Sequence, residues 1–532
     1  MSNRKKRGHV QSLKAPAGIV ARDALAIVEE GTLYYNGLAT PLSGMREGEK
    51  QLVSMGAYIC VFPDKLYYNT ADPADYGSME AAFHYEGQIE YSMCDSEGET
   101  FENVLFSAMA PEDPEAGQLW ADTVSGTLNS YSAESGMWIS YETVYTKLRF
   151  TSEGQIPTLF SRYDGVEIKG ARYEDLCGSK IVHAIGGSAQ KAERDWIVLV
   201  GTVSEDYVQE NAVFDMKCTV PDMDYVCQCQ NRLWGCFYGN DGSGNLNEVY
   251  ACALGDFKNW NQFMGLSTDS WRASVGSDGV WTGAVSYLGS PIFFKEDTLH
   301  RVNVSSVGAH QLGETVCRGV QKGCSKSLAV IDETLFYKAR GQVCAYQGGF
   351  PQSVSAALGE ERYHSAVACG FGHKYYISMC DGKGRWSLFV YDTEKGLWMR
   401  EDELKADFFA PAEDELYCVS GSELYALQGT VGELEKRISW EAETGLLSCS
   451  EPDKKYVNRL SIRSAMEAGT VLEVCIEYDS LGAWDFAGRV QLSHTGTAVL
   501  PLRLRRCDHF RLRLRGSGDI KILSLSREEC RG

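Results

Sequence analysis

The residue types that most often perform catalysis are present in this chain, but their spacing matches no catalytic pattern. The nine histidines are dispersed, and His300, His364 and His373 would meet only if the fold brought them together. No GxSxG, no HExxH and no glycine-rich phosphate loop before a helix occurs. Glycoside hydrolysis needs two carboxyl groups roughly 5–10 Å apart, and the spacing of Asp and Glu in the sequence identifies no such pair. The sequence therefore predicts a protein that is not an enzyme and has no catalytic residues.

Two short segments partly match ligand-site motifs. Ser277–Trp281 is a truncated form of the Asp-box of propeller sialidases, and because it occurs once we interpret it as a turn followed by a core Trp. Gly239–Glu248 is loosely similar to an oxygen-rich calcium loop but lacks the downstream Glu of an EF-hand, which favours a glycine-rich hairpin turn. The 18 cysteines form no CxxC pair, so we expect reduced, buried thiols, no metal site and no cofactor.

Three arginines alternate with leucines near the C-terminus. Arg511, Arg513 and Arg515 lie on one face of a predicted strand, and the two intervening leucines lie on the other. One interpretation is a solvated basic face on an edge strand, which would resist pairing with other chains. The other is an interface that docks an acidic neighbour, such as a second copy of this chain. These arginines are the candidate interface residues.

A short β-hairpin phrase recurs along most of the chain. An apolar run is followed by a tight polar turn and then by Leu with an aromatic residue, at 27–35, 61–68, 226–234, 330–337 and 408–418. A single hairpin cannot bury its own apolar face, so a phrase repeated at intervals of tens of residues predicts a repeat architecture. Because the unit is all-β, the fold class expected is a β-propeller of six or seven blades.

Changes in composition divide the chain into five segments. We expect a flexible basic arm at 1–18, the first propeller strands at 19–72 and an inserted β-rich domain at 73–186. The remaining blades occupy 187–430, with the repeat resuming at Trp196, and a C-terminal antiparallel β-sandwich occupies 436–532. The arm has no apolar run behind its basic residues, so it is not expected to be a secretory signal, and no apolar run is long enough to span a membrane as a helix.

The net charge of −21 is unevenly spread. Residues 436–532 carry 16 Lys+Arg and 13 Asp+Glu, whereas the rest of the chain carries 35 Lys+Arg and 59 Asp+Glu. An acidic body repels the phosphate backbone of nucleic acid. Any contact with DNA is therefore expected to let the DNA slide rather than bind it specifically.

One segment has a more specific likeness than the hairpin phrase. Glu248–Trp260, followed by Val280–Val302, resembles the tail nozzle (tail tubular protein B-like) β-propeller proteins of short-tailed phages, although Cys252 stands where that family usually has Ser. The C-terminal region, through Glu477–Asp479, Trp484 and Pro501–Leu512, resembles a module of Firmicute prophage tail proteins. The nozzle resemblance is carried by these residues: Tyr250, Gly255, Asp256, Trp260, Lys295, Glu296, Asp297 and Arg301.

The resemblance implies a structural virion protein of a phage or prophage tail, made in the cytoplasm of the host bacterium. It would form a homo-oligomeric ring, which is usually a hexamer in that family, that extends the DNA-ejection conduit between a tail adaptor and fibre or tip proteins. The alternative is a carbohydrate- or receptor-binding propeller at the tail tip, which predicts exposed aromatic residues in a blade-end pocket, with Trp260 and Trp271 as the first candidates. A propeller enzyme, such as a glycosidase or lyase, would instead need a convergent pair of acids with at least one raised pKa.

Overall fold

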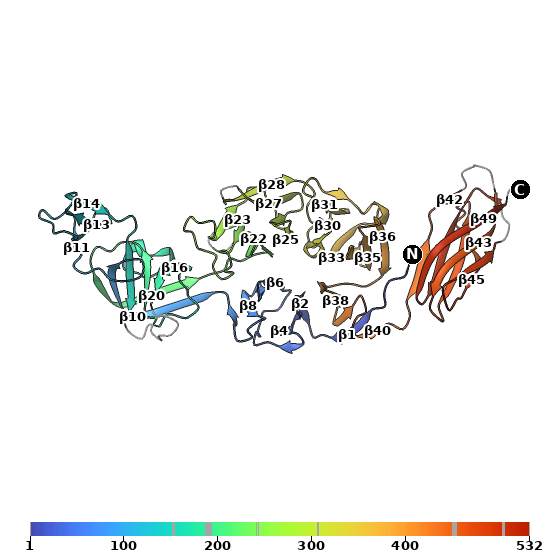
Figure 1. The fold of residues 1–532 in the computed structure, drawn as a ribbon, viewed down its shortest axis with the longest axis horizontal. Helices are drawn as coiled ribbons and strands as arrows, with labels where there is room; N and C mark the ends of the chain where they lie inside the picture. Colours follow the sequence, from blue (N-terminus) through green and yellow to red (C-terminus); the bar gives the residue numbers. More distant parts are fainter. Residues whose placement is uncertain are drawn as a thin grey trace. The chain divides into compact units, whose positions relative to one another are not determined.

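The computed structural model describes residues 2–151, 155–186, 194–240, 242, 244–305, 308–448, 455–502 and 506–530. The chain forms two compact units, one comprising 15–399 and the other joining 1–14 to 400–532. The described residues are almost entirely β, and the protein is a β-propeller with an inserted β-rich domain and a C-terminal β-sandwich, as predicted (Figure 1). The helices of this part are three short 3-10 turns: η1 (Glu174–Leu176), η2 (Ser325–Ser327) and η3 (Ala356–Leu358). None of them is long and apolar enough to cross a membrane.

Six four-stranded antiparallel sheets of the larger unit are built from the predicted hairpins. The two sheets before the insertion contain β2 (Pro16–Ala21), β3 (Leu25–Glu29), β4 (Thr32–Tyr35), β5 (Leu38–Ala39), and β6 (Gln51–Met55), β7 (Tyr58–Phe62), β8 (Leu66–Asn69), β9 (Tyr76–Ser78). The next two contain β21 (Tyr225–Cys229), β22 (Arg232–Asn240), β23 (Asn245–Ala251), β24 (Trp271–Ser274), and β25 (Gly283–Tyr287), β26 (Ser290–Phe294), β27 (Thr298–Val304), β28 (His310–Val316). The last two contain β29 (Ala329–Ile331), β30 (Thr334–Ala339), β31 (Gln342–Tyr346), β32 (Gln352–Ser353), and β33 (Tyr363–Phe371), β34 (Lys374–Asp381), β35 (Trp386–Asp392), β36 (Leu397–Asp402).

The polar turns of the hairpin phrase have the backbone that tight hairpins require. Glu30 and Gly31, between β3 and β4, have φ values of 45° and 71°. Asp332 and Glu333, between β29 and β30, have φ values of 47° and 62°. Positive φ at two successive residues matches the right-handed twist of the flanking strands in a two-residue hairpin. The turns therefore set the register that buries Val28 and Leu33 on the core side.

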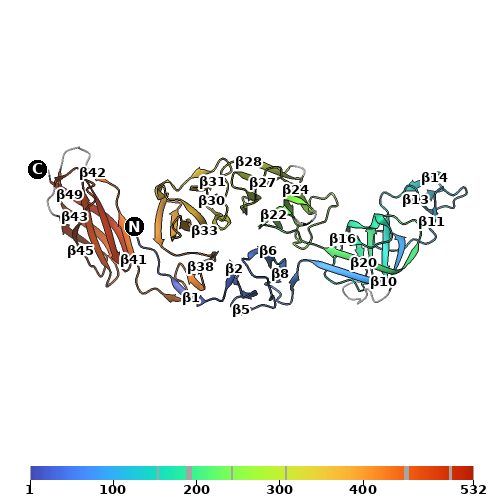
Figure 2. The same ribbon diagram turned by 180° about the vertical axis from the view of Figure 1, so that it is seen from behind.

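The inserted domain is longer than the sequence suggests. Its seven-stranded sheet has the order β17-β16-β20-β10-β15-β19-β18, and a second, small sheet contains four strands. Figure 2 shows the insert, with β10, β16 and β20 labelled on the large sheet and β11, β13 and β14 on the small one. The strands of the large sheet are β10 (Ala81–Cys94), β15 (Tyr145–Phe150), β16 (Gly165–Lys169), β17 (Gly178–Ile181), β18 (Ala184–Ile185), β19 (Trp196–Val200) and β20 (Tyr207–Cys218). Those of the small sheet are β11 (Leu105–Ser107), β12 (Leu119–Asp122), β13 (Thr127–Ser132) and β14 (Met137–Ser140).

The propeller repeat does not resume at Trp196 as predicted, because β19 pairs with β15 inside the insert. Its residues Ile197–Leu199 are fully buried, and a short apolar run of this kind looks the same in any buried strand. The long strand β20 pairs with β10 over most of its length and ends the insert at Cys218. Blade strands return with β21.

The smaller unit contains one further hairpin sheet, whose strands are β37 (Phe408–Pro411), β38 (Leu416–Ser420), β39 (Glu423–Ala426), β1 (Gly8–Ser12) and β40 (Glu433–Leu434), in that order. The arm expected to be flexible at 1–18 is instead ordered within it, because β1 supplies the strand between β39 and β40 (Figure 1). Two of its basic residues form close ion pairs: Arg4 lies 2.6 Å from Glu435, and Arg7 lies 2.6 Å from Asp402. The sequence missed this order because every one of these partners lies about 400 residues away.

The C-terminal sandwich consists of two antiparallel sheets over one apolar core. One sheet contains β41 (Ser439–Glu443), β48 (His509–Ser517), β44 (Val471–Tyr478), β45 (Asp485–Val490) and β42 (Leu447–Ser448). The other contains β46 (Gly496–Pro501), β43 (Lys455–Met466), β47 (Arg506–Cys507) and β49 (Ile520–Cys530). Strand β48 is flanked by β41 and β44, so the arginine strand is interior and not the edge strand that one interpretation assumed.

Candidate functional site

The turn that carries the nozzle resemblance is a structural element of its blade. Gly255 has a φ of 80°, which favours glycine, and the Asp256 carboxylate accepts a hydrogen bond of 3.0 Å from the Lys258 backbone N–H. Trp260 is buried, and its Nε1–H donates to the Phe257 carbonyl at 2.8 Å. Tyr250, on β23, is buried in the same apolar cluster. Trp260 is therefore unavailable as the exposed aromatic residue that the binding hypothesis required.

The second half of the resemblance connects neighbouring sheets. Lys295 is buried, and its ammonium donates to the Asn247 side-chain carbonyl at 3.1 Å and to the Ser277 carbonyl. Burial lowers the pKa of this ammonium. Glu296 is ion-paired with Arg340 of the following sheet. The remaining two residues have backbone and local roles: the Asp297 carbonyl accepts from Cys317 N–H, and Arg301 Nη2 donates to Ser290 Oγ at 3.2 Å.

The three candidate histidines are not brought together in the described structure. His300, on β27, is fully buried, and burial lowers its pKa to about 4, which keeps it neutral near pH 7. Its Nε2 lies 3.2 Å from the hydroxyl of Ser277, at the start of the truncated Asp-box. His364 and His373 lie in a different sheet, where exposed His373 pairs with Asp332 at 2.9 Å. The contacts of His300 and of His373 are therefore local and structural.

The truncated Asp-box forms the predicted turn with a core Trp. Asp278 accepts hydrogen bonds from the Tyr238 hydroxyl and the Gly279 N–H, both at 2.7 Å, and Trp281 is buried. In the calcium-like loop, Asp241 and Ser243 lie outside the described residues. Elsewhere in the described ranges, no group of three or more His, Cys, Asp or Glu side chains could hold a metal ion.

The three candidate interface arginines are engaged within their own sheet. Arg511 is hydrogen-bonded to Glu477, Arg513 Nε donates to Glu443 at 2.7 Å, and Arg515 Nε donates to Glu473 at 3.2 Å. The guanidinium of Arg513 also lies 4.1 Å from the ring centre of Trp484. These contacts follow from the register, which sets Glu473 and Glu477 directly opposite Arg515 and Arg511. The positive charge that docking would require is therefore balanced by carboxylates on the same face.

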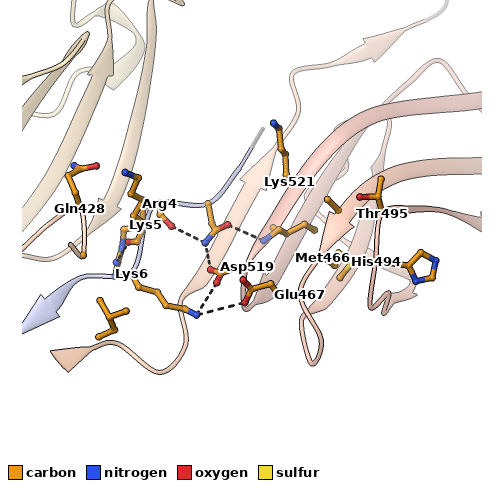
Figure 3. Close-up of a pocket in the computed structure, with 15 residues that line it drawn as sticks. Arg4, Lys5, Lys6, Gln428, Met466, Glu467, His494, Thr495, Asp519 and Lys521 are labelled. Atoms are coloured by element: carbon orange, nitrogen blue, oxygen red, sulfur yellow. Dashed lines mark hydrogen bonds and ion pairs between the residues drawn. The ribbon is translucent and has the colours of Figure 1, made fainter. Parts of the chain in front are cut away.

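A cavity of about 610 Å³ in the smaller unit lies where the N-terminal residues meet the sandwich (Figure 3). Lys6 lies 2.9 Å from Asp519 and 4.0 Å from Glu467, and Asn3 donates to Asp519 at 3.0 Å (Figure 3). The hydrogen bond from Lys6 contributes to a lowered pKa of Asp519, although burial opposes it. The charged groups at the centre of this cavity are thus paired with one another and fix the N-terminal residues on the sandwich.

The small sheet presents aromatic side chains to solvent on one face. Trp120 on β12, Tyr131 on β13 and Trp138 on β14 are all partly exposed. The ring centres of Trp120 and Trp138 are 5.4 Å apart, and those of Tyr131 and Trp138 are 5.3 Å apart. We call these three residues the aromatic face. The opposite face packs into the insert core through Ala121 and Leu128, which are buried.

Strand register explains why the three rings share a face. Tyr131 pairs directly with Trp138, and Trp120 pairs with Asn129, two residues before Tyr131 on the same strand. Directly paired and alternate residues of an antiparallel sheet point to the same side. Apolar residues of β12 and β13 then fall on the core side, so the aromatic rings remain outside.

Hydrogen bonds anchor Trp120 and its strand neighbour Asn129. Trp120 Nε1–H donates to both the carbonyl and the hydroxyl oxygen of Ser107 at 3.1 Å. Asn129, which pairs with Trp120 and is buried, accepts a hydrogen bond of 2.6 Å from the Ser140 hydroxyl. A partly exposed aromatic surface suits a sugar ring, because the negative ring face attracts polarised C–H bonds.

The sequence contained only part of this site. The alternation at Trp138–Tyr141 indicates a strand, but Trp120 and Tyr131 gain significance only from the pairing of β12 with β13 and of β13 with β14. Trp271, proposed from the sequence, is partly buried against Trp234, with ring centres 5.8 Å apart. Composition could have found the site, because residues 95–144 contain ten Asp+Glu and no Lys, Arg or His.

Comparison with known proteins yields structural neighbours only. No family model matches the chain, and no curated protein matches it. An exo-β-1,3-galactanase from Phanerochaete chrysosporium is 11% identical with a TM-score of 0.22, over 56% of this chain and 95% of that one. An arabinoxylan arabinofuranohydrolase of glycoside hydrolase family 43 from Bacillus subtilis is 9% identical with a TM-score of 0.19, over 56% and 95%. The endosialidase of phage phi92 is 8% identical with a TM-score of 0.25, over 93% and 76%.

The prediction that the chain is not an enzyme is withdrawn, because the solved structures that the chain matches include glycoside hydrolases, peptidases and an endosialidase. None of the neighbours named above is a tail nozzle protein. At identities of 11% or less and TM-scores of 0.25 or less, the likeness assigns no reaction to this chain.

Proposed function

We propose that this chain is a carbohydrate- or receptor-binding β-propeller protein of a phage tail, and that the aromatic face of the small sheet binds the glycan. The observation that carries the proposal is the set of three partly exposed rings on one face of the small sheet, with ring centres 5.4 and 5.3 Å apart and ring planes tilted by 63° and 58°. The place in a phage tail is supported by the sequence resemblance of Glu248–Val302 and of the C-terminal region to tail proteins.

The proposal is tested by screening the full chain on a glycan array and measuring the affinity of the best ligand. Trp120→Ala and Trp138→Ala should each weaken binding roughly 10- to 30-fold, as expected for aromatic residues at the centre of a binding surface. Ile139→Ala is the matched control, because Ile139 is exposed on the opposite face of the same strand as Trp138. Unchanged affinity in both Trp variants would refute the proposal.

A second candidate function is a tail nozzle ring through which DNA passes. It is favoured by the nozzle-like segment and by the net charge of −21, which would keep a lumen from retaining DNA. Mass photometry of the purified protein at low and moderate salt tests it. A particle of about six copies supports the ring, and a strict monomer favours the glycan-binding proposal.

A further inference from the structure

The small sheet and its loops carry negative charge without compensation. Residues 95–144 contain ten Asp+Glu and no Lys, Arg or His. Eight of these acids are exposed: Glu97, Glu99, Glu102, Glu112, Asp113, Glu115, Glu134 and Glu142. Across the described ranges, Glu97 is the one member of the ten with an ion pair, which it makes with Arg162. The local field around the small sheet is therefore strongly negative.

Some of this charge lies beside the rings. Asp122 is two residues after Trp120 on β12 and so lies on the aromatic face. A hydrogen bond from the Ser125 hydroxyl lowers the Asp122 pKa, and the Val124 N–H adds to the effect, so this carboxylate is charged at neutral pH. The loop with Glu112, Asp113 and Glu115 leads directly into β12.

Aromatic faces and carboxylates attract the same kind of group. An ammonium over the face of Trp or Tyr is attracted by the ring quadrupole, by about 0.5–2 kcal/mol depending on how far it is desolvated. Nearby carboxylates add long-range attraction and raise the association rate. Anionic glycans, including sialic acid polymers, would be repelled by the same field, and neutral glycans would gain nothing from it.

We propose that the aromatic face binds a glycan that carries ammonium groups, such as a de-N-acetylated amino-sugar polymer, and excludes anionic glycans. This inference rests on the proposed function, because it names the ligand class of the same surface. The ammonium-bearing sugar contacts the rings of Trp120 and Trp138, while Asp122 on the same face and the field of the exposed carboxylates in the preceding loop attract its charge. Charge complementarity thus selects among glycans that the rings alone would bind alike.

The test uses the full chain with three probes of matched length: a glucosamine hexamer held below the pKa of its amines, the N-acetylglucosamine hexamer, and a sialic acid hexamer. We expect the glucosamine hexamer to bind at least 10-fold tighter than the N-acetylated one at low salt, no binding of the sialic acid hexamer, and a preference that falls as salt rises. Equal or tighter binding of the N-acetylated hexamer would overturn the inference while leaving the proposed function standing.

Two variants separate specific binding from simple attraction to an acidic protein. Trp120→Ala with Trp138→Ala keeps every charge and should lose most of the affinity for the glucosamine hexamer; full retention would overturn the inference. Glu112→Gln, Asp113→Asn, Glu115→Gln and Glu134→Gln together keep the rings and should reduce the preference for the amine form about 10-fold. Failure of all three probes overturns the inference, and the glycan array then decides the proposed function independently.

Discussion

The small sheet and the arginine-bearing sheet of the C-terminal sandwich handle charge in opposite ways. In the sandwich, each of Arg511, Arg513 and Arg515 faces a glutamate on an adjacent strand. In the small sheet, nine of the ten carboxylates of residues 95–144 have no ion pair within the described ranges. In the sandwich sheet, opposite charges pair with each other, so these charges contribute to the stability of the fold. The small sheet leaves its charges unmatched, which costs stability through repulsion and is retained more readily where a ligand supplies the opposite charge.

The largest effect that distinguishes the two surfaces is expected from reversing the arginines. Arg511→Glu, Arg513→Glu and Arg515→Glu together would set like charges against Glu477, Glu443 and Glu473, and should lower the melting temperature of the sandwich by roughly 10 °C or more. Differential scanning calorimetry of the full chain measures the change. If the arginines served only to dock a partner, the isolated protein would melt unchanged.

Two controls accompany that variant. Arg463→Glu reverses an exposed arginine of β43, on the other sheet, that has no ion pair in the part of the chain that the structure describes, and it should leave the melting temperature within about 1 °C. Exchanging one pair, with Arg513→Glu and Glu443→Arg, should recover most of the stability that Arg513→Glu alone removes.

Acidification should act on the sandwich in a defined direction. A hydrogen bond from Arg489 lowers the Glu473 pKa, with Arg515 contributing. Burial acts to raise the Glu477 pKa, but Arg511 and the Gly482 N–H outweigh it and hold it below its ordinary value of 4.5. Because the folded-state pKa values are lowered, the stabilisation is present above about pH 4.5 and is lost as pH falls through the folded-state values.

Hydrogen exchange measured by mass spectrometry resolves this effect by region. Between about pH 6 and pH 3.5, and after correction for intrinsic exchange rates, β44 and β48 should lose protection. The small sheet should lose less protection, because protonation relieves repulsion among carboxylates that have no basic partner and offsets the stabilisation lost at Asp122, whose pKa is lowered. Equal loss of protection in both regions would show that the two surfaces do not differ in how their charges are paired.

The hairpin scaffold was predictable because its signal is local. The phrases at 27–35, 61–68, 226–234, 330–337 and 408–418 coincide with the pairs β3–β4, β7–β8, β21–β22, β29–β30 and β37–β38. A two-residue turn and its flanking strands are specified within about ten residues, so neighbouring residues suffice.

The functional surfaces depend on register between distant strands, which local patterns do not contain. The sequence shows the arginines as a basic face because it does not show that Glu443, Glu473 and Glu477 lie opposite them. These partners are 34 to 70 residues away in the chain. Likewise, Trp260 is no less aromatic than Trp120 and Trp138, and only its burial separates it from them, whereas Trp271 is partly exposed as they are but packs against Trp234. The predicted end of the insert was wrong for the same reason. The sequence of β19 resembles that of a blade strand, and only its pairing with β15 shows that it belongs to the insert.

A smaller effect is expected from reversing charge on the small sheet. Glu112→Lys, Asp113→Lys, Glu115→Lys and Glu134→Lys together should leave the melting temperature of the insert unchanged or raise it by about 1–2 °C, because these exposed side chains give up no ion pair and lose mutual repulsion. The same variant should reverse the ligand preference, so that the sialic acid hexamer binds better than the glucosamine hexamer. A drop in stability comparable to that of the arginine variant would mean that these carboxylates have structural partners.

Salt gives the smallest effect, and its sign is what matters. Raising the ionic strength from about 0.01 M to 1 M shortens the Debye length from roughly 30 Å to 3 Å, which screens attraction and repulsion between exposed charges alike. With sodium chloride, protection from hydrogen exchange should fall slightly around Arg513 and Arg515, where screening weakens pairs that are partly exposed. It should rise slightly in the loops of the small sheet, where screening relieves repulsion. A general effect of salt on hydration would change protection in the same direction in both regions, so changes of opposite sign isolate the electrostatic difference. A change of the same sign in both regions would show that the unpaired carboxylates of the small sheet do not repel one another appreciably.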